Sequence, residues 1–155
     1  MPGVEVAAAV LELSLSNLIA NAIKYSDPAK EKRWVEIRAR VALPDTGGAL
    51  QTIVEVHDNG LGVPEANRAR LFERFFRAHE ASHSGIDGTG LGLSIVKDTV
   101  SSIGGRAWAE FTDGETVFCF SMPTRRKEDE ARIPTPVTAP PAIVSGDQTS
   151  EASAH

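Results

Sequence analysis

Cysteine is almost absent from this chain of 155 residues, since Cys119 is the only one. A single thiol excludes an internal disulfide and a cysteine-ligated zinc site, and it suits a reducing compartment. Residues 1–6 lack the charged and apolar regions of a signal peptide, and no apolar run is long enough to span a bilayer. The sequence therefore predicts a cytoplasmic segment, whether or not a parent protein is attached to a membrane.

A concentrated positive charge is also missing. The formal net charge is -5, and Lys and Arg are scattered without a basic stripe, which argues against nucleic acid as a partner. Hydrophobic residues make up 41% of the chain and charged residues 24%, which is ordinary for a soluble globular protein with one core. The length corresponds to one domain.

Aromatic residues are missing from residues 125–155, which instead hold four of the nine prolines and many Ser, Thr and Ala residues. A segment of this composition cannot bury enough apolar surface to fold. We therefore expect a folded domain over residues 1–124 and a disordered tail over 125–155. A solvated terminus is the favoured interpretation of the tail, and a linker or docking segment is the alternative.

The apolar pattern of residues 1–124 predicts a mixture of helices and strands. Predicted helices cover residues 7–25, 65–78 and 91–103. Predicted strands cover residues 3–6, 33–43, 52–56, 106–111 and 116–122. Hairpins between neighbouring strands indicate an α+β fold, in which a mixed sheet carries its helices on one face.

Three glycines at alternate positions, Gly88, Gly90 and Gly92, open directly into the last predicted helix. Because they carry no Cβ, the backbone can approach a ligand closely, and the unpaired N–H groups of the helix point the same way. The motif predicts a phosphate cradle. Taken alone, it is explained equally well by a flexible loop before an ordinary helix.

A polar stripe runs along the first predicted helix, because Ser14, Asn17, Asn21 and Lys24 recur at spacings of three and four residues. Asn is unfavourable inside a helix, so a ligand is one reason for its presence. An Asn carbonyl facing a nucleotide suits Mg²⁺, which fills its remaining positions with waters and phosphates, and Lys24 could meet phosphate charge. Alternatively, the stripe is the solvent-facing side of the helix.

Asp58 ends a predicted strand and is followed by Gly60 and Gly62. A carboxylate at this point can accept a hydrogen bond from an exocyclic amine such as that of adenine, while the glycines let a base lie flat against the backbone. The sequence Asp-Asn-Gly is also a good hairpin-turn signal. The order of the motifs along the chain decides between these interpretations.

Three motifs occur in one order: Asn-Leu-Ile-Ala-Asn-Ala-Ile-Lys-Tyr-Ser at 17–26, Asp-Asn-Gly-Leu-Gly-Val-Pro at 58–64, and Gly-Thr-Gly-Leu-Gly-Leu-Ser at 88–94. This order closely resembles the catalytic, ATP-binding domain of sensor histidine kinases, in the wider family of gyrase, Hsp90 and MutL ATPases. Residues 71–77 are similar to the phenylalanine box of histidine kinases. The resemblance covers residues 3–123 and implies a Bergerat ATP-binding fold, a two-layer α/β sandwich with a mixed, mostly antiparallel sheet.

The resemblance also implies a role for each motif residue. Asn21 would bind Mg²⁺, and the residues near the phosphates of ATP would be Asn17, Lys24 and Arg77. Tyr25 would flank the nucleotide, and Asp58 would hold the adenine amine. Gly60 and Gly62 would line the adenine pocket. Thr116 would support adenine through water. The lid and phosphates would be framed by Gly88, Thr89, Gly90, Leu91 and Gly92.

Asn17 marks a departure from the ATPase branches of this family. In those branches a glutamate four residues before the magnesium-binding Asn positions the hydrolytic water, whereas histidine kinases carry Asn. Without a general base for water, transfer to a protein nucleophile is favoured over hydrolysis. A self-contained gyrase-type ATPase, a non-catalytic nucleotide-binding module and a serine-kinase anti-sigma factor are the alternatives.

No histidine of the chain resembles a phosphoacceptor. His57 lies in a predicted strand, His79 and His83 fall in the predicted lid, and His155 ends the tail. None of them sits in a helix of the His-Glu-Leu-Arg type. We therefore expect the ATP-binding half of a kinase, whose partners are the dimerisation and phosphoacceptor domain of a parent protein and, downstream, a response regulator.

The predicted lid covers residues 79–88, whose serines and glycines offer little to a core. Such a segment can close over ATP. Phe75 and Phe76 lie just before it. They either pack into the core or anchor the lid to dimerisation helices of the parent protein.

Overall fold

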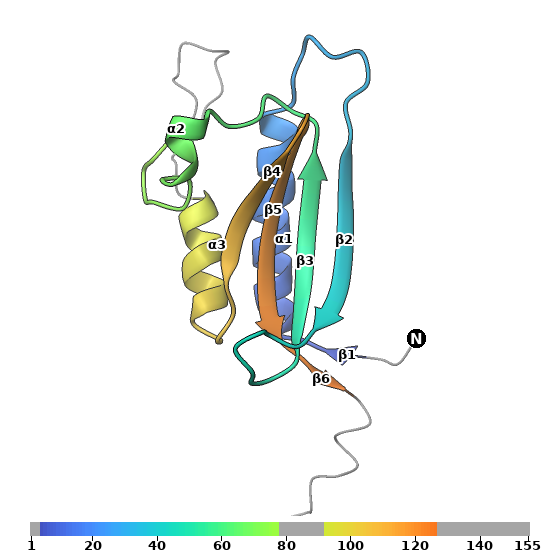
Figure 1. Ribbon diagram of the computed structural model, residues 1–155, viewed down its shortest axis with the longest axis vertical. Helices are drawn as coiled ribbons and strands as arrows, with labels where there is room; N and C mark the ends of the chain where they lie inside the picture. Colours follow the sequence, from blue (N-terminus) through green and yellow to red (C-terminus); the bar gives the residue numbers. More distant parts are fainter. Residues whose placement is uncertain (1–3, 78–91, 127–155) are drawn as a thin grey trace, which may run out of the picture.

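The computed structural model describes residues 4–77 and 92–126 (Figure 1). The elements follow one another as β1 (Val4–Glu5), α1 (Ala8–Lys24), β2 (Val35–Ala42), β3 (Gln51–Asp58), α2 (Glu65–Arg68), α3 (Gly92–Ser101), β4 (Ala107–Thr112), β5 (Glu115–Pro123) and β6 (Arg125–Arg126). The two longer helices, α1 and α3, cover one face of a four-stranded sheet. The predicted α+β sandwich is therefore confirmed.

The four-stranded sheet has the order β2-β3-β5-β4, and each neighbouring pair is antiparallel. The strands within residues 4–77 and 92–126 include no parallel pair, so the mixed character expected of the sheet does not occur there. Gly114 has a φ of 78° in the β4–β5 hairpin, a conformation that favours glycine. Because β3 lies beside β5, Asp58 at the C-terminal end of β3 is paired with Thr116, almost sixty residues later in the sequence.

Helix α1 forms because its residues include neither Gly nor Pro and are rich in Ala and Leu, which have high helix propensity. It follows Ala7 and ends before Tyr25, within one residue of the predicted bounds at each end. Its inner face buries Leu18 and Ala22. Among the described helices, none combines the length and the apolar character that crossing a membrane requires.

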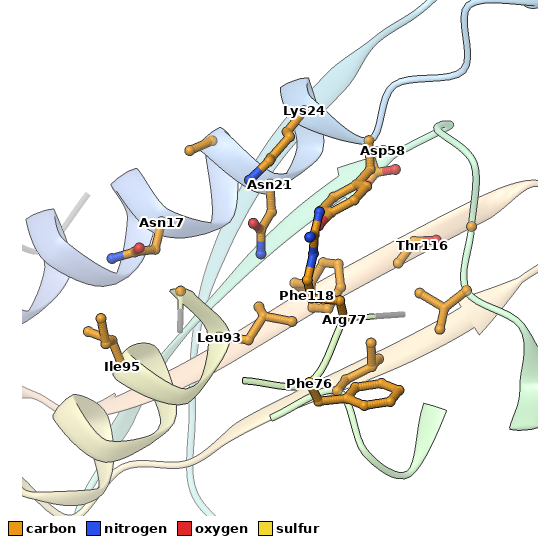
Figure 2. A pocket seen from close by; sticks show the side chains of 16 residues that line it. Asn17, Asn21, Lys24, Asp58, Phe76, Arg77, Leu93, Ile95, Thr116 and Phe118 are labelled. Carbon is orange, nitrogen blue, oxygen red and sulfur yellow. The ribbon is translucent and has the colours of Figure 1, made fainter. Parts of the chain in front are cut away.

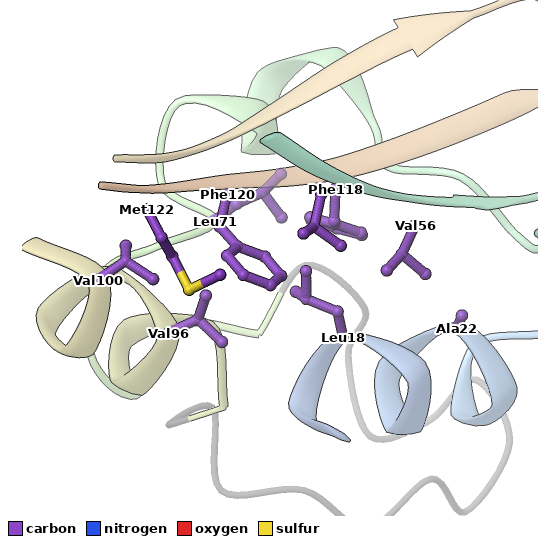
Figure 3. Close-up of a cluster of buried hydrophobic side chains, with 10 residues drawn as sticks. Leu18, Ala22, Val56, Leu71, Val96, Val100, Phe118, Phe120 and Met122 are labelled. Atoms are coloured by element: carbon purple, nitrogen blue, oxygen red, sulfur yellow. The ribbon is translucent and has the colours of Figure 1, made fainter. Parts of the chain in front are cut away.

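The core lies between the sheet and the helices (Figure 3). Its buried side chains come from α1, β3, the 71–77 segment, α3 and β5, and they are Leu18, Ala22, Val54, Val56, Leu71, Val96, Val100, Phe118, Phe120 and Met122. Each fully buried Val, Leu, Phe or Met contributes about 1.5–3 kcal/mol to the free energy of unfolding. This packing fixes α1 and α3 against β3 and β5, which surround the candidate site.

The chain after α2 differs from the helix predicted over residues 65–78. Within the described part of this range, residues 65–77, only Glu65–Arg68 is α-helical, and turns follow it. Phe75 has a φ of 63°, and this left-handed backbone cannot continue a right-handed helix. The side chain of Phe75 is 73% exposed, whereas Leu71 is buried in the core. Phe75 therefore does not pack into the core.

A two-stranded sheet joins the two ends of the described fold. Strands β1 and β6 are antiparallel, and Glu5 is the partner of Arg125. Strand β6 lies just past residue 124, where the sequence places the end of the folded domain. Its two residues, 125 and 126, were predicted to belong to the disordered tail over 125–155 but are paired in a strand. The rest of that tail lies outside the described residues, and its disorder stays a prediction.

Candidate functional site

A cavity of about 360 Å³ opens between α1, the start of α3, strand β5 and the loop that follows β3 (Figure 2). We call residues 58–62 of that loop the base loop. The side chains and backbone that line the cavity belong to Asn17, Ala20, Asn21, Lys24, Tyr25, Asp58, Gly62, Val63, Leu71, Phe76, Arg77, Gly92, Leu93, Ile95, Thr116 and Phe118. A cavity of this size accommodates a small-molecule ligand such as a nucleotide.

Helix α1 forms one wall of the cavity and presents Asn17, Asn21 and Lys24 to it (Figure 2). These residues lie on one face because their spacing matches the helical repeat. Ser14 does not share this environment, because it is 0% exposed and does not line the cavity. The expected polar stripe therefore begins at Asn17.

The carbonyl oxygens of Asn17 and Asn21 converge on the first residue of α3. A Cβ on Gly92 would lie 3.4 Å from Asn17 Oδ1 and 3.9 Å from Asn21 Oδ1. The amide nitrogen Nδ2 of Asn17 donates to the carbonyl of Leu13 at 2.8 Å, which leaves Oδ1 directed toward α3. Glycine at position 92 therefore keeps the space beside two amide oxygens open.

These two oxygens fit a hard cation of the Mg²⁺ type. Magnesium prefers oxygen ligands and completes its octahedron with water and phosphate oxygens. The described ranges 4–77 and 92–126 contain no group of three His, Cys, Asp or Glu side chains arranged to hold a metal ion. A cation beside Asn21 would therefore depend on the amide oxygens and on the oxygens of its ligand.

Asp58 and Thr116 form the other end of the cavity. They are antiparallel partners on β3 and β5, and their exposed fractions are 6% and 4%. The N–H of Gly60 donates to Asp58 Oδ1 at 2.9 Å. Burial raises the pKa of the Asp58 carboxyl above its ordinary value, and the Gly60 N–H and the charges of Lys30 and His57 oppose that rise.

Glycine is favoured at positions 60 and 62 of the base loop for two different structural reasons. A Cβ on Gly60 would lie 2.4 Å from the carbonyl oxygen of Tyr25, so the loop can pack against the end of α1 only with glycine there. Gly62 has a φ of 71°, where glycine is favoured. Gly62 lines the cavity, but Gly60 lines a neighbouring cavity instead. Gly60, which was expected to line an adenine pocket together with Gly62, is therefore not among the residues that line this cavity.

Two cations face the cavity from different elements. The ammonium of Lys24 lies 5.9 Å from the centre of the Tyr25 ring, and both side chains are half-buried. Arg77 extends from the end of the 71–77 segment toward the wall formed by α1 (Figure 2). The amide oxygens and these cations give this part of the cavity the chemistry of an anion site.

The structure thus gathers nine of the predicted site residues around one cavity, namely Asn17, Asn21, Lys24, Tyr25, Asp58, Gly62, Arg77, Gly92 and Thr116. The predicted lid and four further site residues lie outside the described residues, namely Gly88, Thr89, Gly90 and Leu91. The apolar part of the lining was not predicted and includes Val63, Phe76, Leu93 and Phe118. Val63, Phe76 and Leu93 lie within the motifs but were assigned no role at the ligand, and Phe118 lies in none of them. The roles of the individual site residues stay predictions.

Residues 8–126 match the model of the histidine kinase-, DNA gyrase B- and HSP90-like ATPase family, HATPase_c. The chain belongs to this family. Most of the relatives compared, and the structural neighbours MprB and ThkA, are histidine kinases, and the matches identify the chain as an ATP-binding catalytic domain of the sensor histidine kinase type. A self-contained gyrase-type ATPase is not favoured by these matches.

Three relatives illustrate the similarity. Sensor histidine kinase WalK of Bacillus subtilis (strain 168) is 30% identical over 118 residues, which are 75% of this chain and 18% of WalK. The structure of the mycobacterial sensor histidine kinase MprB superposes with a TM-score of 0.58 at 30% identity, covering 77% of this chain and 76% of that one. Full-length ShkA in complex with AMPPNP superposes with a TM-score of 0.61 at 29% identity, covering 81% of this chain and 24% of ShkA. The chain therefore spans less than a fifth of the length of the curated relative WalK.

Proposed function

We propose that this domain binds Mg-ATP in the cavity of Figure 2 and presents the γ-phosphoryl group to a histidine on the dimerisation domain of a parent sensor kinase. The base would lie against Asp58 and Thr116. The phosphates would lie against Asn21, Lys24 and Arg77. This activity belongs to the cytoplasm, where ATP and a response regulator are available.

The observation that carries the proposal is the distribution of charged, polar and apolar groups along the lining of the cavity. One end holds a buried carboxylate, which accepts hydrogen bonds and suits an exocyclic amine. Farther from Asp58 along α1 lie the amide oxygens of Asn21 and Asn17, which suit a hard cation and its phosphates, and the cations Lys24 and Arg77 line the same cavity. Apolar residues such as Val63 and Phe118 lie among the remaining lining residues and suit the faces of a purine. A purine nucleotide matches all three parts.

Asn17 supports phosphoryl transfer over hydrolysis. Its side chain is an uncharged amide whose Nδ2 donates to the carbonyl of Leu13. An amide cannot remove a proton from water, and the oxygen of Asn17 faces Gly92. A neutral imidazole attacks phosphorus without first losing a proton, so it needs no general base on this domain.

The work left to this domain is orientation and charge neutralisation. Asp58 and the base loop would fix the base, while Lys24 and Arg77 would neutralise the charge that develops on the transferred group. Bound Mg²⁺ would supply additional positive charge between the phosphates. The complex of ShkA with AMPPNP, an ATP analogue, supports the same ligand class for the present chain.

An exposed aromatic residue beside the cavity supports docking to the dimerisation domain. Phe75 is 73% exposed in a left-handed backbone conformation, whereas its neighbour Phe76 lines the cavity. Strained residues of this kind persist where the surrounding structure or a function requires them. Phe75 would therefore contact the helices that carry the phosphoacceptor.

Calorimetric titration with AMPPNP tests the nucleotide site. We expect binding that strengthens with Mg²⁺ and is lost in Asp58→Ala, while the circular dichroism spectrum stays that of the wild type. A folded wild-type domain that binds no nucleotide would instead support a degenerate, non-catalytic module. Phosphoryl transfer is tested separately, by mixing the domain and labelled ATP with the dimerisation domain of the parent kinase.

A further inference from the structure

The connection between α1 and β2 is tied to the base loop by side-chain contacts that the sequence motifs do not include. The ammonium Nζ of Lys30 donates to the carbonyl of Asn59 at 2.6 Å and lies 3.5 Å from the carbonyl of Gly60. Asn59 in turn accepts from the N–H of Trp34 at 3.0 Å and donates to the carbonyl of Lys32 at 2.9 Å. We call these four contacts the lysine brace.

The brace complements the other hydrogen bonds of the base loop. The N–H of Gly60 donates to Asp58 Oδ1, and the N–H of Leu61 donates to the carbonyl of Tyr25 at 2.9 Å. The N–H groups at 60 and 61 are thus used within the loop and by α1, while the carbonyls of 59 and 60 are used by Lys30. Hydrogen bonds to a charged donor are stronger than neutral ones. The carbonyls of residues 59 and 60 therefore share one charged donor, the ammonium group of Lys30.

Lys30 does not belong to the nucleotide cavity. It lines, together with Gly60, an adjoining cavity of about 470 Å³ that shares Gly62, Val63 and Thr116 with the nucleotide cavity. The hydrogen bonds of Lys30 to the base loop are therefore the contacts through which it would position a bound base. Its positive charge also lowers the pKa of the Asp58 carboxyl against the opposing effect of burial, together with the Gly60 N–H and His57.

We propose that Lys30 is a positioning residue for base recognition: it holds the base loop in the geometry in which Asp58 accepts an amine, and it thereby sets the preference for adenine over a 6-oxo purine. The first half concerns the fold alone. The second half rests on the proposed nucleotide site. A loop released from Lys30 would still form part of the cavity, but Asp58 would no longer be fixed opposite the amine.

The first experiment tests the brace without nucleotide. Amide hydrogen exchange of Gly60 and Leu61 is measured by NMR in the wild type, Lys30→Met, Lys30→Arg and Arg33→Met. Arg33 is the matched control because it is an exposed cation of the same connection whose side chain has no hydrogen-bond or ion-pair partner in the described part of the chain. We expect exchange at least about tenfold faster in Lys30→Met, and wild-type exchange in Arg33→Met. Unchanged exchange in Lys30→Met would overturn the proposal.

The second experiment tests recognition, using ADP and inosine diphosphate, which carries an oxygen in place of the adenine amine. The dissociation constant for inosine diphosphate divided by that for ADP should fall by about tenfold in Lys30→Met. It should stay near the wild-type value in Lys30→Arg and Arg33→Met. On acidification, Lys30→Met should also lose its affinity for ADP at a higher pH than the wild type does. Without the positive charge of Lys30 the pKa of Asp58 is higher, although the Gly60 N–H and His57 still lower it, so the carboxylate becomes protonated earlier.

The outcomes separate the two proposals. A wild type that binds neither nucleotide would refute the proposed function and the recognition half of the inference, while hydrogen exchange would still decide whether the brace exists. If the wild type binds ADP and the ratio of the two dissociation constants is the same in Lys30→Met, the inference is refuted and the proposed function stands. Melting temperatures of all variants identify any that fail to fold.

Discussion

Asp58 and Thr116 face each other across β3 and β5 as antiparallel partners. The register of the sheet therefore sets this end of the candidate site, rather than a flexible loop. Successive side chains of a strand alternate between the two faces of the sheet, so a slip of one residue would turn Asp58 to the open face. The core residues Val54 and Val56 on the same strand resist such a slip.

Asp58→Asn should separate binding from stability. The variant keeps an acceptor for the N–H of Gly60 but loses the charge, so affinity for ADP should fall by about 10-fold to 100-fold, since a charged hydrogen bond contributes about 1.5–3 kcal/mol. Titration calorimetry measures this loss. An affinity equal to that of the wild type would remove Asp58 from the recognition of the base.

Asp58 gives the wild type a predicted pH dependence of stability that Asp58→Asn lacks. Burial raises the pKa of Asp58 in the folded state above its ordinary value of 3.8, so the fold favours the protonated carboxyl. Its contribution to the free energy of unfolding is therefore highest below pH 3.8 and declines as pH rises through the folded-state pKa. Asp58→Asn should equal or exceed the wild type in urea unfolding at pH 7. A large loss of stability at pH 7 would contradict this sign.

Asn21→Ala should remove the contribution of magnesium. If Asn21 supplies an oxygen to the cation, affinity for ADP with Mg²⁺ should fall to the value measured in EDTA, while the value in EDTA stays close to that of the wild type. Ser16→Ala, on an exposed position of α1, is the control and should retain the full magnesium effect. A magnesium effect of wild-type size in Asn21→Ala would exclude Asn21 as a ligand.

The two glycines of the base loop should respond differently to substitution. Gly60→Ala inserts a Cβ 2.4 Å from the Tyr25 carbonyl and should lower the free energy of unfolding by about 1–3 kcal/mol. A Cβ on Gly62 would meet no other atom within 4 Å, and Asn tolerates the left-handed backbone of this position, so Gly62→Asn should cost about 1 kcal/mol or less. Urea unfolding compares them, and the reverse order would show that the close approach to Tyr25 is relaxed in solution.

Cys119 should be inert until the domain unfolds. It is 1% exposed, and burial, with a smaller contribution from Glu110 and Glu55, raises its pKa to about 12. Alkylation by iodoacetamide needs the thiolate, so labelling at pH 8 should be slow in buffer and fast in denaturing urea. Mass spectrometry follows the reaction. Labelling in buffer at the rate of a free cysteine peptide would refute the burial of Cys119.

Phe75→Gly should affect the partner without affecting the fold. Glycine relieves the left-handed backbone at this position but adds freedom to the unfolded chain, so the free energy of unfolding should change by about 1 kcal/mol or less. Affinity for ADP should stay at the wild-type value. Phosphoryl transfer to the dimerisation domain of the parent kinase should fall, and a wild-type rate of transfer would place the docking contact elsewhere.

The wall of the site on α1 was predictable because the spacing of Asn17, Asn21 and Lys24 is a local property of a helix. The same argument failed for Ser14, since the rotation of a helix against its sheet depends on packing that spacing alone does not fix. The helix expected over residues 65–78 also failed, since it ends at Arg68 and turns follow, with Leu71 buried in the core and Phe75 in a left-handed conformation. Propensity is a weak guide where such contacts decide.

The lysine brace could not be predicted for a different reason. Lys30 and Asn59 are 29 residues apart, and the acceptor is a backbone carbonyl, which every residue carries. No residue type or spacing in the sequence marks such a contact. Gly60 is an intermediate case, since its identity marked the site but its actual neighbour, the Tyr25 carbonyl, became visible only in the fold.

Strands β1 and β6 lie side by side at the end of the fold opposite the C-terminal end of α1 (Figure 1). Because the two ends of the described fold are adjacent, they can be joined and the chain opened elsewhere without moving any strand. A circular permutant that joins residue 126 to residue 4 through a short glycine-rich linker and opens between Gly47 and Gly48 would keep every strand neighbour. Because none of these positions lines the nucleotide cavity, the permuted protein should bind the same ligand from a reordered chain.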